Sequence, residues 1–289
     1  MLAVYEKELK AYFRSSIGPI FIGLFLLAST LLFVFGFLMT GYVMYTQYLY
    51  YLNLVFMLTV PILTMRTLSE ERKTKTDQLL LTSPLKASDI VIGKYLAAVT
   101  VLLITLLIHS LDAIVISLFA TNMYFLDVVI GYFGLFIVGC AYVAIGIFVS
   151  STTTNQVISA IVTFAVLALI YGVQLLSTSV VSSVTSGIIT CGVVALLIAL
   201  LIYTTTKNKI VTLCILIVEA CLIGFIAMLN INIYAGLLNT LLTWVSLLER
   251  FTEYLYGSVS FSSLVYILSF SFVFVYITIY QVEKRRWVG

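Results

Sequence analysis

The sequence has few charged residues. They make up 9% of its 289 residues, while 62% are hydrophobic. Globular proteins have about 25% charged and roughly 45–50% apolar residues. A soluble chain of this composition would expose apolar patches far above the few hundred Å² that soluble monomers tolerate. The composition therefore excludes a soluble enzyme, a DNA-binding module and a disordered chain, and it predicts an integral membrane protein.

Other scarce residues exclude further kinds of site. His109 is the single histidine, so a metal site with two histidine ligands is excluded. The four cysteines lie inside apolar runs, where small buried residues are expected rather than a disulfide or a metal site. The net charge of +3 is too small to suggest a nucleic-acid partner, and no G-x-x-x-x-G-K-[ST] phosphate-binding motif occurs. We expect no catalytic residue, no metal and no directly bound cofactor.

The long apolar runs predict about eight transmembrane helices, because a helix needs about 20 mostly apolar residues to cross a bilayer. Only helices and closed barrels satisfy the backbone in lipid, so the predicted fold is an all-α membrane bundle. The second run is short and contains Pro61. The predicted spans are 17–40, 49–65, 92–120, 126–150, 157–178, 184–206, 210–231 and 261–282.

The distribution of Lys and Arg predicts the orientation. With eight spans, every basic residue except Arg250 falls on one side of the membrane. Cytoplasmic loops carry an excess of Lys and Arg, so we expect both termini in the cytoplasm and the chain in the cell membrane. With seven spans instead of eight, basic segments would fall on both sides of the membrane. The one-sided distribution therefore supports eight spans.

Residues 1–15 are predicted to form an amphipathic helix in the cytoplasmic interface. Apolar side chains recur at helical spacing, while Glu6 and Lys10 lie four residues apart on another face. The alternative is a plain charged anchor before the first span. The apolar residues are Leu2, Tyr5, Leu9, Tyr12 and Phe13.

Residues 66–94 form a predicted cytoplasmic loop with six basic and four acidic residues. Glu70 and Glu71 suit the positive N-terminal end of a short helix. An apolar patch follows at residues 79–81, and Pro84 ends it. The patch indicates a docking surface for a cytoplasmic partner; the alternative is that its leucines lie on the membrane.

Residues 230–260 follow the i, i+3, i+4, i+7 apolar pattern of an amphipathic helix. A full span here would bury Glu249, Arg250 and Glu253 and would break the orientation count. We expect one or two short external helices before the last span.

Three ionisable residues lie inside the predicted spans and away from the span ends, where such groups are functional candidates by default. His109 and Asp112 are three residues apart and share a helix face, so they could neutralise each other. Glu219 lies near the middle of the seventh predicted span without a partner in its sequence neighbourhood. A proton relay, a cationic-substrate site and a purely structural role all stay open.

The chain resembles the ABC-2 type permeases, most closely the gliding-motility and NosY-like branch. The resemblance is carried by residues 61–66 (PILTMR), 70–72 (EER), Thr76, 79–85 (LLLTSPL) and 92–95 (IGKY), with similar segments at 7–13, 16–20 and 283–287. It implies a permease that pairs with a second permease subunit, as a homodimer or heterodimer. Each subunit would dock a cytoplasmic ABC ATPase that binds ATP and Mg²⁺, so the chain itself would not be an enzyme.

The resemblance also implies roles for particular segments. Residues 1–15 correspond to the connecting helix, with Tyr5, Leu9, Tyr12 and Phe13 on its apolar face. Residues 66–94 correspond to the loop that carries the coupling helix. The common family core has six spans, so eight leaves an extra pair, taken to be spans six and seven. The implied ATPase-docking residues are Ser69, Glu70, Glu71, Arg72, Thr76, Asp77, Leu79, Leu80 and Leu81.

Three other functions remain open from the sequence. A secondary transporter or channel would need a charged pathway or broken helices, and the chain has only three prolines. A membrane-embedded enzyme is disfavoured because no H-E-x-x-H motif occurs. A non-transporting membrane anchor for a signalling ATPase would carry the same docking loop as an exporter.

Overall fold

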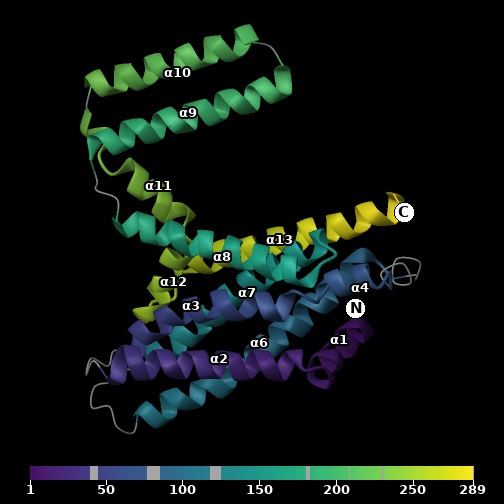
Figure 1. The fold of residues 1–289 in the computed structure, drawn as a ribbon. Helices are drawn as coiled ribbons and strands as arrows, with labels where there is room; N and C mark the ends of the chain where they lie inside the picture. The colour runs from purple at the N-terminus through teal and green to yellow at the C-terminus, as the bar shows by residue number, and fades with distance from the viewer. Residues whose placement is uncertain are drawn as a thin grey trace. The chain divides into compact units, whose positions relative to one another are not determined.

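The computed structural model describes residues 1–39, 45–76, 85–117, 125–179, 183–207, 209–229 and 231–288. Every regular element in these ranges is helical, which confirms the predicted all-α class (Figure 1). The elements are α1 (Leu2–Arg14), α2 (Ile17–Phe33), the π-helix η1 (Val34–Leu38), α3 (Tyr45–Thr64), α4 (Ser69–Lys73), α6 (Ala87–Ser117), α7 (Phe125–Thr152), α8 (Gln156–Ser179), α9 (Val184–Thr206), α10 (Lys209–Leu229), the 3₁₀-helix η2 (Ile231–Tyr234), α11 (Leu237–Val245), α12 (Leu247–Leu255) and α13 (Phe261–Val288).

Seven of the described helices are long and apolar enough to cross a membrane. They coincide with seven of the eight predicted spans. The predicted span 184–206 is helical throughout as α9, and its described apolar stretch, Val184–Leu196, is shorter. The apolar runs therefore locate the helices, and the exact boundaries depend on contacts that the runs do not encode.

Helix α3 continues through Pro61, which lies inside it. A proline removes one backbone donor, and Ser or Thr side chains can bond to backbone groups near such a site in a membrane helix. Here the Thr59 hydroxyl donates to the Val55 carbonyl at 2.8 Å, and the Thr64 hydroxyl donates to the Val60 carbonyl at 3.0 Å. The helix also starts at Tyr45, earlier than predicted, where the Tyr45 and Tyr132 hydroxyls are hydrogen-bonded at 2.8 Å.

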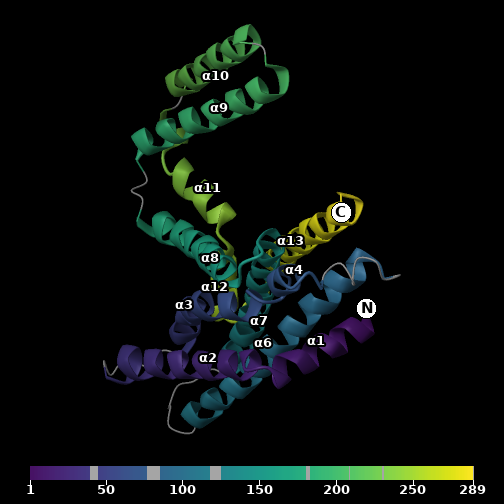
Figure 2. The same cartoon turned by 45° about the vertical axis from the view of Figure 1, so that its right-hand side comes forward.

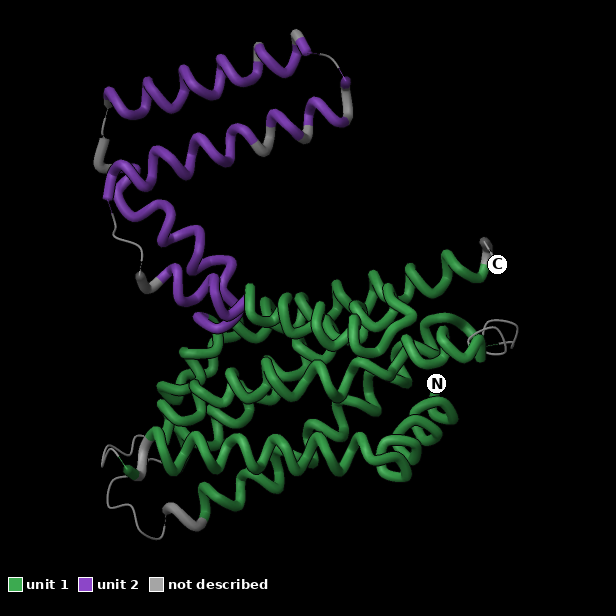
Figure 3. The backbone as a smooth tube through the Cα atoms, viewed as in Figure 1, with its two compact units in different colours: residues 1–169, 250–289 green, residues 170–249 purple. Residues whose placement is uncertain are grey.

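Contacts divide the chain into two compact units (Figure 3). Unit 1 comprises residues 1–169 and 250–289. Its centre is α7, the most buried of the long apolar helices, which packs against α3, α6 and α13. Gly146 allows the close approach of α3, because an added Cβ would overlap the Thr64 side chain. The prediction of one permease domain stays a prediction.

Unit 2 comprises residues 170–249. Helices α9 and α10 lie side by side and antiparallel within it, and both views show this pair (Figures 1 and 2). At Gly187 of α9, an added Cβ would overlap the Tyr234 carbonyl of η2. Since a backbone atom cannot rotate away as a side chain can, only glycine fits there. The segment 230–260 contains two short helices, α11 and α12, in keeping with the one or two predicted; their external position stays a prediction.

Candidate functional site

Helix α1 lies against the start of α6, so only part of its apolar face is free (Figure 2). Tyr12 is buried, and its hydroxyl bonds to the Leu63 carbonyl and the Thr67 hydroxyl, both at 3.2 Å. Burial raises the pKa of the Tyr12 phenol above its ordinary value, so the phenol stays neutral at physiological pH. The Tyr5 hydroxyl is hydrogen-bonded to Thr100 of α6 at 3.1 Å. Leu9 is half-buried.

The remaining apolar side chains of α1 face outward. Leu2 is 70% exposed and Phe13 is 45% exposed. The predicted apolar face is therefore divided: its tyrosines bond to the bundle, while Leu2 and Phe13 are available to lipid. This division suits a helix at a membrane interface that is also fixed to the spans.

A buried lysine joins α1, α4 and α6. Lys94 of α6 is 1% exposed, and its ammonium donates three hydrogen bonds. The acceptors are Glu8 Oε1 of α1 at 3.0 Å, Glu71 Oε1 of α4 at 2.9 Å and the Thr67 carbonyl at 2.9 Å. An ammonium has three donors, so the geometry satisfies all of them. We call Glu8, Thr67, Glu71 and Lys94 the lysine cluster.

The C-terminal end of α7 holds the other side of the α4 segment. The Ser150 hydroxyl accepts from the backbone amides of Leu68 and Ser69, both at 3.1 Å. These are orphan donors at a helix start, so Ser150 caps α4 from a distant part of the chain. The Ser151 carbonyl accepts from Arg72 at 2.9 Å and also from Arg285 of α13. Cations at a helix C-terminus are stabilising, since the last carbonyls carry partial negative charge.

The far end of α4 is exposed. Lys73, Thr74, Lys75 and Thr76 are all solvent-accessible, and we call them the α4 tip. Thr74 Oγ1 donates to the Glu70 carbonyl at 2.9 Å and also bonds to Thr76 Oγ1 at 2.9 Å. Lys75 adopts a left-handed conformation with φ of 59°, which turns the chain out of the helix. The α4 tip is therefore a hydrogen-bonded turn that follows a helix fixed to the bundle.

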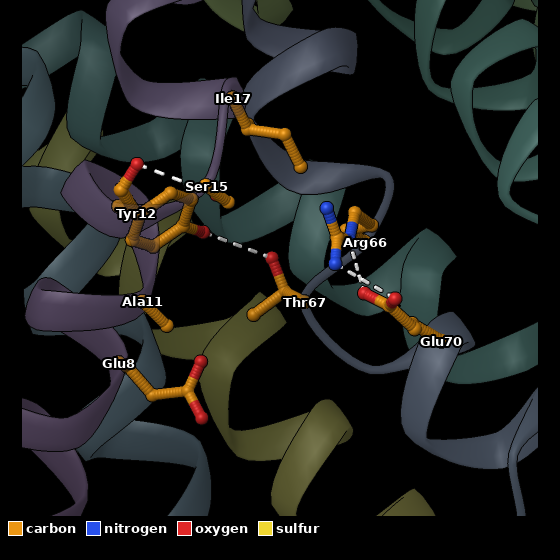
Figure 4. Close-up of a pocket in the computed structure, with 8 residues that line it drawn as sticks. All are labelled: Glu8, Ala11, Tyr12, Ser15, Ile17, Arg66, Thr67 and Glu70. Carbon is orange, nitrogen blue, oxygen red and sulfur yellow. Dashed lines mark hydrogen bonds and ion pairs between the residues drawn. The ribbon is translucent and has the colours of Figure 1, made fainter.

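A pocket of about 130 Å³ lies between α1 and the start of α4 (Figure 4). Tyr12 points toward Thr67 on one wall, and Arg66 forms a bidentate pair with Glu70 on the other. Because the Arg66 guanidinium is already paired, the pocket does not present a free cation for a ligand. We assign it a packing role between the two segments.

The predicted docking residues thus fall into three groups. Ser69, Glu71 and Arg72 bond within the bundle, and Ser69 is fully buried. Glu70 pairs with Arg66 at the surface, and Thr76 lies at the exposed tip. Asp77, Leu79, Leu80 and Leu81 lie outside the described residues.

Sequence reasoning did not find the residues that hold the α4 segment in place. Lys94 was counted only as a basic residue of the loop, although it is buried in a long apolar helix. A lone lysine inside such a helix is costly unless it is paired, so it is itself a signal of distant acidic partners. No comparable signal marks Ser150, since serine at a helix end is common.

His109 lies in a second buried cluster, among α2, α3, α6 and α7. The ring is fully buried, and Nε2 and Nδ1 are hydrogen-bonded to the hydroxyls of Tyr48 and Tyr132 at 2.8 and 2.7 Å. Tyr48 also donates to the Ser29 carbonyl at 3.2 Å. Asp112 is 47% exposed and lies 4.0 Å from Nε2. The closer partners of His109 are therefore tyrosines, which join four helices through one ring.

Glu219 belongs to unit 2, on α10, whereas the residues of both clusters belong to unit 1. Its Oε2 is buried and has no hydrogen-bond partner. The structure therefore brings together the predicted residues of α1 and α4, pairs His109 with Asp112 only loosely, and leaves Glu219 in a separate environment.

Comparison with known proteins adds one match. A family model described as "ABC-2 family transporter protein" matches residues 17–206. The matched region runs from the start of α2 to the end of α9 and includes the whole α4 segment. No curated protein matches the chain.

Proposed function

The chain belongs to the ABC-2 family of transporter proteins, and from this we propose that it is the permease subunit of an ATP-driven exporter. Two permease subunits would form the translocation path between them. A separate cytoplasmic ATPase would bind and hydrolyse ATP with Mg²⁺, since this sequence has no phosphate-binding motif. Both termini and the α4 segment would face the cytoplasm, where the basic residues are concentrated.

The observation that carries the proposal is the set of hydrogen bonds that fixes α4 to three other helices. The exposed α4 tip projects from a base that is bonded to α6 through Lys94, to α7 through Ser150, and to α1 through the lysine cluster. A partner that pushes on the α4 tip would therefore displace three helices together rather than bend a loose loop. Such rigid coupling is what a switch between two packed arrangements requires.

We infer distinct parts for the predicted docking residues. In our proposal the α4 tip and the apolar residues 79–81 contact the ATPase. Glu71 and Arg72 do not contact the ATPase but hold α4 in place, because their side chains bond to Lys94 and to the Ser151 carbonyl. Helix α1 acts as the connecting helix, which transmits the same movement to α6 through the bond between Glu8 and Lys94.

Affinity purification of the tagged chain in a mild detergent tests the proposal. We expect a stoichiometric ABC ATPase to co-purify with the native chain, and we expect Lys73→Glu at the α4 tip to reduce its yield several-fold. Lys284→Glu is the matched control, because Lys284 is also an exposed lysine near the end of a helix. It should leave the yield unchanged.

Three results would count against this proposal. A native chain that purifies without an ATPase in several detergents would favour a transporter or channel that works without one. An ATPase that co-purifies equally with Lys73→Glu would place its docking surface elsewhere. An ATPase that co-purifies but supports no substrate movement in vesicles would indicate a membrane anchor for a signalling ATPase.

A further inference from the structure

Glu219 faces an apolar pocket of about 270 Å³ within unit 2. The walls come from three helices of this unit, each through one face at helical spacing. Helix α10 contributes Glu219, Leu222 and Ile223, and α9 contributes Cys191 and Ala195 among others. Two leucines of α11 complete the lining. Cys191 and Ala195 have small side chains and line the pocket together with Glu219.

The carboxylate has no positive partner among the described residues of its unit. Among the described residues that line the pocket, Glu219 is the only charged one, and its buried Oε2 has no hydrogen-bond partner among them. The basic residues of unit 2 are Lys207 and Lys209. Lys209 begins α10, and at 1.5 Å per residue it lies about 15 Å from Glu219 along the helix axis. This distance is too great for an ion pair.

The pocket is held in shape from one end. The Tyr234 hydroxyl of η2 donates to the Ile223 carbonyl at 2.8 Å, one turn beyond Glu219 on α10. The same tyrosine packs its backbone against Gly187 of α9. These two contacts connect α9 and α10 through η2 at one end of the space between the helices.

We propose that this pocket binds an amine with an apolar body, with the ammonium group bonded to Glu219. A buried acceptor without a partner is destabilising, and charge-assisted bonds from an ammonium would satisfy it. The apolar walls would contact the rest of the ligand, in the common pattern of one polar group within an apolar site. A neutral ligand would leave the carboxylate uncompensated. The inference concerns binding by this chain alone and does not depend on an ATPase partner.

Equilibrium dialysis of the purified full chain in detergent tests the proposal, with tritiated 4-phenylbutylamine as the probe and empty micelles as the blank. We expect saturable binding by the native chain at neutral pH. Glu219→Gln should weaken it at least tenfold, whereas Glu219→Asp, which keeps the charge, should weaken it only a few-fold. Ala195→Phe should also abolish binding, because the larger side chain would fill part of the pocket that Ala195 lines.

Ala220→Phe is the matched control for size, since Ala220 is exposed and lies outside the pocket on the same helix as Glu219. It should bind the amine as the native chain does. The neutral analogue 4-phenylbutan-1-ol should bind at least tenfold more weakly than the amine. Equal affinity for the two compounds, undiminished binding by Glu219→Gln, or no saturable binding by the native chain would each overturn the proposal. Loss of ATPase co-purification would leave it unaffected.

Discussion

Replacing Lys94 by Met would remove a positive charge that three segments share. The ammonium is 1% exposed and bonds to Glu8, Glu71 and the Thr67 carbonyl. Met has a similar length and is apolar, so packing is largely kept while all three hydrogen bonds are lost. The two carboxylates, which are 15% and 17% exposed, would then lose their shared cation. Of its ion-pair partners among the described residues, Glu8 would keep only the exposed Lys7, at 4.0 Å.

The expected loss follows from this burial. Removing one partner of a buried ion pair costs about 3–5 kcal/mol, because the remaining charge is left uncompensated. Since solvent still reaches part of both carboxylates, we expect a value near the lower end, about 3 kcal/mol. Lys10→Met is the matched control, because Lys10 pairs with Glu6 at 3.7 Å and both side chains are over 60% exposed. Such a surface pair contributes about 0.3–0.5 kcal/mol.

The measurement is the free energy of unfolding of the purified chain, from titration with a denaturing detergent followed by circular dichroism. A triple variant, Lys94→Met with Glu8→Gln and Glu71→Gln, should recover at least half of the loss, because no unpaired charge remains. The reasoning would be refuted if Lys94→Met and Lys10→Met were equally stable, or if the triple variant were no more stable than Lys94→Met.

Gly146→Ala should lower the free energy of unfolding by about 1–3 kcal/mol, because the added methyl would overlap Thr64 of α3. Gly23→Ala is the control and should be neutral or stabilising, since an added Cβ there meets no neighbouring atom within 4 Å. Equal thermal midpoints for the two variants would contradict the prediction. Tyr132→Phe should lower the free energy of unfolding by about 1–3 kcal/mol, since it leaves the buried His109 Nδ1 without its hydroxyl partner. An unchanged free energy of unfolding would show that this hydrogen bond does not stabilise the bundle. Arg72→Ala should weaken ATPase co-purification, because it removes a bond that fixes α4 to α7. Alkaline extraction of membranes checks that the variant is still inserted. Undiminished co-purification would show that this bond is not needed for ATPase docking.

The helices could be predicted from the sequence because lipid leaves the backbone few choices. Residues 126–150 were predicted as a span, and α7 covers Phe125–Thr152. Without water to satisfy amides and carbonyls, a long apolar run must form a helix whatever its neighbours. The ends are less constrained: α13 continues to Val288, beyond the predicted residue 282, and its last turn contains Arg285, which bonds to the Ser151 carbonyl.

The partners within the site could not be predicted in the same way. Lys94 lies 86 residues from Glu8 and 23 from Glu71, so their contact depends on the register of three helices. Charged residues in a loop look alike in sequence whether they are solvated or paired. The resemblance implies that Glu71 and Arg72 dock a partner. In the structure both side chains bond within the chain, and their docking role stays a prediction.

The Ser151 carbonyl accepts hydrogen bonds from Arg72 of α4 and Arg285 of α13. Because this acceptor belongs to the main chain, any residue small enough for this buried position supplies it, alanine included. An alanine scan of α7 would therefore not detect this junction of α4, α7 and α13. Exchange of small residues at position 151 among relatives would likewise suggest that the position has no role. The junction would be visible only from its two donors, as a pair of arginines far apart in the sequence whose removal has similar effects.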